Sequence, residues 1–243
     1  MRPLLCLVIL AASALAARGQ RPYEQDTIAT LQGPLHITFI GHAAVMFTWQ
    51  DRVVHVDPVT READYATLPK ADLVLITHEH RDHLDTLAWR QIRKVSTVIA
   101  IPPAGSAMVP EGIVLRNGEV DTLAGFPVEA VPAYNVVHKR SSGEPFHPPG
   151  RGNGYVVAFG ETRVYIAGDT EDIPEMQELG DITIAFLPMN LPYTMTPEMA
   201  ANAARMVRPK ILYPYHYGNS DVQRLVELLR EEKGIEVRIR QMH

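Results

Sequence analysis

Thiol groups and basic clusters are nearly absent from this sequence of 243 residues. Its one cysteine, Cys6, lies inside an apolar stretch at the N-terminus, so a mature chain without that stretch contains neither disulfides nor thiolates. Any metal ion in such a chain must be held by nitrogen and oxygen atoms alone. The formal net charge is −5 and no block of basic residues occurs, so the composition indicates no nucleic-acid-binding surface.

The apolar stretch itself is too short to cross a bilayer comfortably. It extends from Leu4 to Ala17, follows a basic start, and ends in small residues that offer an A-x-A-like cleavage site. We therefore predict a secretory signal peptide over residues 1–17, with an uncleaved anchor or a buried strand as the alternative. The protein is expected to be secreted or periplasmic, without stable membrane insertion, and to form a single domain over residues 22–243.

The sequence is rich in metal-ligating side chains at one point, residues 77–83, which read THEHRDH and follow an apolar run typical of a buried strand. Residues two apart on an extended chain point the same way, so His78 and His80 are expected to leave the strand end side by side. The following turn offers Asp82 and His83 from another direction. Four potential ligands in six residues suit two adjacent metal ions better than a solvated polar loop. Imidazole and carboxylate together favour zinc, iron or manganese.

Elsewhere the chain mixes predicted strands and helices. Residues 23–30 are predicted to be a poorly packed lead-in, and residues 135–154 a long loop of the kind that is usually functional or disordered. Helices are expected at residues 84–92, 174–179, 196–207 and from 220 to a stop at Gly234. Strands are expected at residues 35–40, 44–49, 53–56, 71–76, 97–101, 113–115, 126–131, 155–159, 163–167, 181–187 and 210–215. This pattern predicts sheets with helices on their outer faces, an α/β fold.

Three further polar residues directly follow predicted strands: Asp57, Asp169 and His216. Loops at strand ends are where layered α/β proteins usually place their chemistry. If these ends meet at one edge of the fold, a set of imidazoles and carboxylates converges there, namely His78, His80, Asp82, His83, Asp169 and His216.

These motifs resemble those of the metallo-β-lactamase fold hydrolases: a His-x-His-x-Asp-His string, Gly168-Asp169-Thr170 after a strand, and a late His216-Tyr217-Gly218. Further motifs are similar to the branch that contains ascorbate-6-phosphate lactonase-like proteins, namely Gly41-His42-Ala43, Asp57-Pro58, Ala133-Tyr134-Asn135, Phe146-His147-Pro148 and Gly152-x-Gly154-Tyr155. The resemblance covers nearly all of the mature chain. It implies a four-layered αββα sandwich with a binuclear metal site along one edge.

The resemblance also implies a ligand set. His78 and His80 would hold the first metal ion, and Asp169 would bridge both ions through its carboxylate. The second ion would be held by Asp82, His83 and His216.

One ligand of the first site departs from the superfamily pattern, which usually supplies a third histidine. The matching position here is Asn135. His147 is favoured as the replacement, because the Phe-His-Pro string around it resembles this branch's own pattern. An Asn135 amide oxygen, His138, or a weak first site are the alternatives.

Residues around this set have less certain roles. Asp57 is either the hydrogen-bond partner of a ligating imidazole or a turn residue that ends a strand. His42 either lines the pocket or is a structural histidine. Lys139, Arg140 and Arg151 would tolerate an anionic substrate, although solvated loop charge explains them equally well.

The expected chemistry follows from two divalent metal ions, with zinc favoured over manganese or iron. Such ions lower the pKa of a bridging water, and the hydroxide would attack a carbonyl carbon or a phosphorus, with Asp82 or Asp169 carrying the proton. We predict a metal-dependent hydrolase that acts on an ester, lactone, amide or phosphodiester bond of a small molecule. An iron-dependent oxidoreductase on the same fold and a non-catalytic metal-binding module are the alternatives.

Overall fold

Two seven-stranded sheets form the centre of the protein, in a computed structural model that describes residues 23–242. The predicted signal peptide lies outside the described residues. The first sheet contains, in spatial order, β1 (Glu24–Thr30), β2 (Gly33–Gly41), β3 (Ala44–Trp49), β4 (Arg52–Val56), β5 (Leu73–Leu75), β6 (Val98–Ile101) and β7 (Ile113–Val114). The second contains β14 (Glu236–Val237), β13 (Ile211–Tyr215), β12 (Ile184–Pro188), β11 (Thr162–Ile166), β10 (Gly152–Phe159), β9 (Phe126–Ala133) and β8 (Val120–Leu123).

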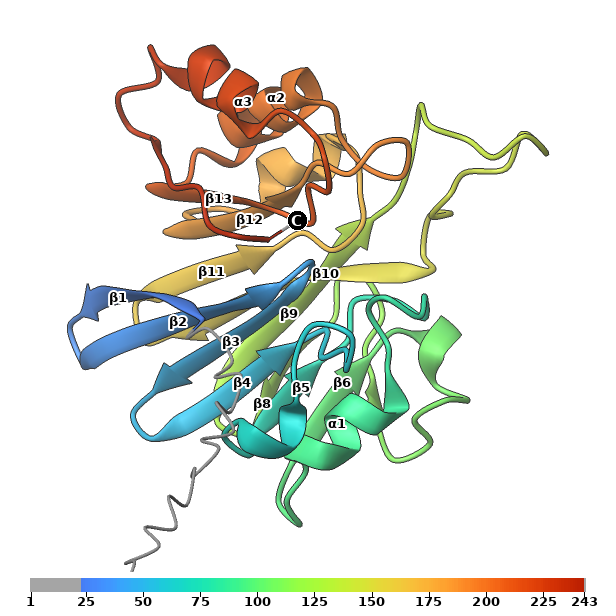
Figure 1. Cartoon of the computed structure of the whole chain (residues 1–243), viewed down its shortest axis with the longest axis vertical. Coiled ribbons are helices and arrows are strands. Elements are labelled where there is room, and N and C mark those ends of the chain that lie inside the picture. Colours follow the sequence, from blue (N-terminus) through green and yellow to red (C-terminus); the bar gives the residue numbers. More distant parts are fainter. Residues whose placement is uncertain (1–22, 243) are drawn as a thin grey trace, which may run out of the picture.

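Helices cover the outer faces of both sheets. Helices α2 (Pro197–Val207) and α3 (Val222–Leu229) lie over the second sheet, and α1 (Thr86–Ile92) lies on the opposite side of the molecule beside the first (Figure 1). Three short 3₁₀ turns complete the set: η1 (Tyr65–Thr67), η2 (Pro103–Gly105) and η3 (Pro174–Glu178). The predicted four-layered αββα sandwich is therefore confirmed. None of the helices in residues 23–242 has the length and apolar character needed to cross a bilayer.

Strand β5 shows how the sheet carries the metal-ligating motif. Leu73 and Leu75 pack into the core between the two sheets, whereas Val74 and Ile76 pack with Trp89 of α1 on the outer face. Both faces of β5 are buried, which explains the continuous apolar run, since a parallel strand covered on both sides has no polar face. The strand is parallel to β4 and β6 and thus ends where they end.

One prediction at the N-terminus is wrong. Residues 24–30 are not a poorly packed lead-in, because β1 pairs with β2 along its whole length. Their side chains alternate between exposed and half-buried, so an edge strand with polar residues looked like a loop. Asp26 also accepts hydrogen bonds from Arg240 and Tyr213 near the other end of the chain. Pairing across the sheet, which a local pattern does not reveal, stabilises this segment.

The second sheet also contains strands that the sequence pattern did not indicate, β8 and β14, both short and at its edges. Helix α3 ends at Leu229 rather than near Gly234. Three neighbouring strands of this sheet, β11, β12 and β13, are parallel. Their carboxyl ends therefore meet at one edge, where sheets of this kind bind ligands.

Candidate metal centre

Three imidazoles form the first cluster at this edge: His78, His80 and His147. Nε2 of His78 lies 3.1 Å from Nδ1 of His80, and one ligand atom from each of the three residues lies within 4.8 Å of the others. His78 and His80 leave the end of β5 side by side, as their spacing predicts. His147 comes from the loop between β9 and β10.

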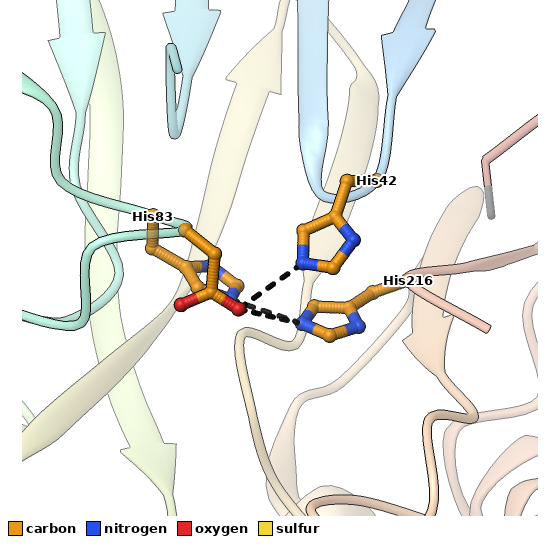
Figure 2. A group of neighbouring side chains, drawn as sticks. His42, His83 and His216 are labelled. Atoms are coloured by element: carbon orange, nitrogen blue, oxygen red, sulfur yellow. Dashed lines mark hydrogen bonds and ion pairs between the residues drawn. The ribbon is translucent and has the colours of Figure 1, made fainter. Parts of the chain in front are cut away.

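Three side chains that follow β5 and β13 form the second cluster. His83 and His216 face one another with their Nε2 atoms 3.1 Å apart. Oδ2 of Asp82 lies 4.0 Å from Nε2 of His83 and 3.9 Å from Nε2 of His216. Figure 2 shows the rings of His83 and His216 close together, with His42 beside His216. The turn after β5 thus supplies two of these three candidate ligands, and the end of β13 supplies the third.

Asp169 lies between the clusters and presents a different oxygen to each. Its Oδ2 is 3.9 Å from Nε2 of His78 and 3.3 Å from Nε2 of His147. Its Oδ1 is 3.4 Å from Nε2 of His83 and 3.5 Å from Nε2 of His216. A carboxylate with this orientation can bridge two cations.

The chemistry of these side chains fits cations. Oδ1 of Asp169 is buried and has no hydrogen-bond partner among the described residues, which is costly for a carboxylate unless a cation neutralises it. Burial raises the pKa of Asp169 to about 6 and lowers the pKa of His147 to about 3. Burial and the neighbouring imidazoles also lower the pKa of His78 and of His216. These rings are therefore neutral at pH 7, the form in which imidazole binds a metal ion.

Asp57 orients the ring of His83 in the second cluster. Its Oδ2 accepts a hydrogen bond of 2.8 Å from Nδ1 of His83, and the hydroxyl and backbone N–H of Thr77 donate to the same carboxylate. Since the Thr77 hydroxyl proton is committed to Asp57, Nδ1 of His78 donates to the Thr77 oxygen, at 3.1 Å. Both imidazoles thus carry their proton on Nδ1 and direct Nε2 at the centre. Burial alone would lower the pKa of His83, but Asp169 and Asp57 outweigh it and raise the pKa to about 9.

The three candidates for the third position of the first site occupy different places. The structure places His147 beside His78 and His80. Oδ1 of Asn135 accepts hydrogen bonds from the backbone N–H and from Nδ1 of His147, both at 2.8 Å. His138 instead donates through Nδ1 to Glu171, at 2.7 Å. The geometry therefore makes His147 the ligand candidate and Asn135 its hydrogen-bond partner.

His42 is a member of the second cluster that the sequence did not single out as a ligand. Its Nε2 donates to Oδ2 of Asp82 at 3.2 Å, and its ring centroid lies 3.8 Å from that of His216 (Figure 2). The residue has a positive φ of 53°, and its carbonyl accepts a hydrogen bond from the backbone N–H of His216. The interruption of the strand pattern at Gly41-His42-Ala43 was the available signal.

A cavity of about 330 Å³ opens onto both clusters. Five predicted ligands line it, together with three residues of other kinds: His80, Asp82, His147, Asp169 and His216, with Arg140, Phe146 and Tyr193. Its size suits a small organic molecule, at the lower end of the usual range for ligand pockets. The cavity is therefore bordered by both candidate metal sites and by the long loop after β9.

Comparison with known protein families identifies the family of this chain. Residues 36–216 match the family described as the beta-lactamase superfamily domain. The chain belongs to this family.

Relatives carry a more specific name. A UPF0173 metal-dependent hydrolase of Nanoarchaeum equitans is 30% identical over 83% of this chain and 94% of its own length. A second one, of Thermococcus onnurineus, is 32% identical over 74% of this chain and 84% of its own length. A solved structure from Parabacteroides distasonis, described as that of a metal-dependent hydrolase, is 50% identical with a TM-score of 0.86, over 91% of this chain and 100% of that one. The predicted assignment to the metal-dependent hydrolases of this superfamily is thus confirmed.

A diiron β-hydroxylase from Streptomyces venezuelae, CmlA, shares the fold alone, at 18% identity and a TM-score of 0.68 over 90% of this chain and 53% of that one. A protein with this fold therefore catalyses a different reaction, so the fold by itself does not show that the chain is a hydrolase. The names of the relatives at 30% identity and above favour hydrolysis.

Proposed function

We propose that this protein hydrolyses an ester, lactone, amide or phosphodiester bond of a small molecule at a centre of two divalent metal ions. The observation that carries the proposal is the orientation of Asp169, whose two carboxylate oxygens face separate groups of imidazoles. His78, His80 and His147 would hold one ion. Asp82, His83 and His216 would hold the other.

Two ions at these positions would supply a water of lowered pKa and would polarise the carbonyl or phosphoryl oxygen of the substrate. The protein contributes orientation and proton transfer. The Asp169 carboxylate is enclosed between the clusters and can act only as a bridge. The Asp82 side chain is 39% exposed and lines the cavity, so it is the carboxylate that can accept a proton from the attacking water and release it to the leaving group.

Zinc is the ion we propose, with manganese and iron as alternatives. The donor set contains imidazole nitrogens and carboxylate oxygens only, and the substrate side of each cluster opens onto the cavity, as in catalytic zinc sites that keep a position free. Lactones belong to the candidate substrates through the resemblance to the ascorbate-6-phosphate lactonase-like branch. The N-terminal apolar stretch supports the further proposal that the substrate is encountered outside the cytoplasm, after secretion.

The decisive experiment combines elemental analysis of the purified protein with a panel of aryl esters, lactones, amides and phosphodiesters. We expect two zinc ions per chain, turnover of at least one substrate class, loss of turnover with a chelator, and recovery when zinc is added. Iron together with oxygen consumption would instead establish the oxidoreductase. Retained metal without turnover of any class would support a metal-binding module, and a protein that gains neither metal nor activity would refute the proposal.

A further inference from the structure

We propose that the substrate carries an anionic group, a carboxylate or a phosphate, which Arg140 binds in the cavity beside the first cluster. This inference rests on the proposed function, since it concerns the same cavity. Arg140 is the one lysine or arginine among the residues that line it. The sequence offers three cations in this loop, and the structure separates them.

The other two cationic side chains, Arg151 and Lys139, are not candidates for binding the anionic group of the substrate. Arg151 forms an ion pair with Glu79, with Nη2 and Oε1 2.6 Å apart, so its charge is already neutralised. Lys139 does not line the cavity. Arg140, in contrast, has no carboxylate within 4.0 Å among residues 23–242.

Local contacts hold Arg140 in position. Its Nη2 donates to the carbonyl oxygen of Phe146 at 3.1 Å, and its guanidinium carbon lies 5.1 Å from the centroid of the Phe146 ring. Its backbone N–H donates to the carbonyl of Glu144, and its own carbonyl accepts from Gly143, which closes a tight turn. Only one guanidinium nitrogen is used by the protein, so a planar fork remains free for an oxyanion.

The charge of the site and its apolar wall define the rest of the ligand. Two divalent ions would bring four positive charges against three carboxylates, Asp57, Asp82 and Asp169, so the cavity would keep a net positive charge that Arg140 increases. Phe146 and Tyr193 meet edge to face with centroids 5.0 Å apart. A small organic anion with an apolar body and a hydrolysable bond matches this arrangement.

Three esters that differ only at one end test the inference on the zinc-loaded protein. They are the 4-nitrophenyl esters of pentanoic acid, glutaric acid and 4-phosphonobutanoic acid, which carry no charge, a carboxylate and a phosphonate. We expect the wild type to prefer a charged ester, and the better of the two identifies the anion. Arg140→Gln should lower kcat/KM for that ester by about 10- to 100-fold, the effect of one hydrogen bond to a charged group, while the neutral ester is unaffected.

The matched control is Lys139→Gln, which removes the same charge from the neighbouring position and should leave all three rates at the wild-type value. Equal losses on all three esters with Arg140→Gln, or no preference in the wild type, would overturn the inference. If no ester is hydrolysed, calorimetric titration of the zinc-loaded protein with glutarate and with inorganic phosphate still decides it. Weaker binding of either anion to the Arg140→Gln variant than to the wild type supports the anion site, and unchanged binding of both refutes it.

A second inference rests on a separate hydrogen-bond chain. We infer that Asn135 and Glu171 are positioning residues for His147. Asn135 uses its whole amide, because Oδ1 accepts twice from His147 while Nδ2 donates to Glu171 at 3.1 Å and to the carbonyl of Tyr193 at 2.9 Å. The bond to Nδ1 keeps the His147 proton on that atom and leaves Nε2 free to bind a metal ion.

Glu171 anchors this chain to the end of the second sheet. It is completely buried, and it accepts hydrogen bonds from the backbone N–H groups of residues 136, 137 and 138 at 2.6–2.7 Å. The carboxylate thus ties the start of the long loop to the strand end that carries Asp169.

Zinc titration against a chromophoric chelator tests the second inference without reference to activity. Asn135→Leu and Glu171→Gln should each weaken one of the two zinc equivalents by about 10- to 100-fold, as loss of a ligand's hydrogen-bond partner does elsewhere, and leave the other unchanged. Asn202→Leu, which removes an amide that pairs with Asp172 at the surface, is the control and should bind like the wild type. Equal weakening of both equivalents, or of neither, in the Glu171→Gln variant would refute it.

Discussion

The two halves of the metal centre are held in different ways. The second half, with Asp82, His83 and His216, is built from the ends of β5 and β13, and both of its imidazoles are buried to within 1% exposure. The first half takes His147 from a long loop, which is held at the site by a backbone hydrogen bond between Asn135 and His147 and by side-chain hydrogen bonds of Asn135 and Glu171. Both halves take side chains from the end of β5, but the first half depends on Asn135 and Glu171 for the position of its third imidazole, His147.

The long loop of the first half contributes to two properties of the site at once. The loop that supplies His147 also supplies Arg140 and Phe146, so a single segment carries a candidate metal ligand and part of the cavity wall. A change in this loop alters substrate recognition and the first site together. The second half offers the cavity only Asp82 and His216 and is otherwise enclosed, so it is the more rigidly held part of the centre.

The largest effect is expected where the two halves meet. Asp169→Ala removes the carboxylate whose two oxygens face the two halves, so zinc binding should weaken in both equivalents. Activity should fall by at least about a thousandfold, which corresponds to about 4 kcal/mol of barrier. Zinc content and kcat/KM are the measurements, with Asp172→Ala as the neighbouring control. Loss of only one zinc ion would show that the halves are independent and would contradict the bridging role.

Removal of one imidazole from each half should lower the free energy of unfolding by different amounts. His83→Ala leaves the fully buried Asp57 without its ion-pair partner, so we expect the free energy of unfolding of the metal-free protein to fall by about 3–5 kcal/mol. His147→Ala breaks one hydrogen bond to a loop and should cost about 1 kcal/mol. Urea denaturation at pH 7 compares the two variants. Similar losses would mean that the halves are equally rigid.

A backbone change should affect both halves to the same extent. Gly168 has a φ of 67°, and a Cβ at this position would lie 2.7 Å from the backbone oxygen of Asn153. Gly168→Ala therefore strains the turn that presents Asp169 and should cost about 1–3 kcal/mol of stability. Zinc titration should show both equivalents weakened. Gly143→Ala, where the added Cβ meets nothing within 4 Å, controls for the positive φ alone. A selective loss of one zinc ion would indicate that Asp169 belongs to one half.

The smallest effect is expected at His42. Its hydrogen bond to Asp82 is partly exposed to solvent, so His42→Ala should reduce kcat/KM by about fivefold, equivalent to about 1 kcal/mol. Only the zinc equivalent of the second half should weaken. His36→Ala is the control, because His36 lies on β2, the strand that ends just before His42, and is hydrogen-bonded to Thr27 at the surface. An unchanged second equivalent would place His42 outside the centre.

Much of this arrangement could be predicted from local patterns. The apolar run before His78 indicated a buried strand, and the two-residue spacing indicated that His78 and His80 share a direction. Asp169 and His216 were recognisable because each follows an apolar strand directly. Polar edge strands such as β1 were missed, because their stability comes from partners distant in the sequence and not from their own side chains.

Hydrophobic periodicity and strand ends are local properties, so the sequence pattern predicted an α/β fold and a converging set of nitrogen and oxygen donors. The four layers and the division of the donors into two groups were predicted from the resemblance to a known superfamily. The folded structure was needed to show which of Asn135, His138 and His147 faces the centre, that His42 lies beside it, and that Arg140, unlike Lys139 and Arg151, lines the cavity. These features depend on a long loop, and such a loop has no periodicity of its own. Its conformation is set by a buried carboxylate, Glu171, which lies more than 30 residues away in the chain and satisfies the loop's backbone N–H groups.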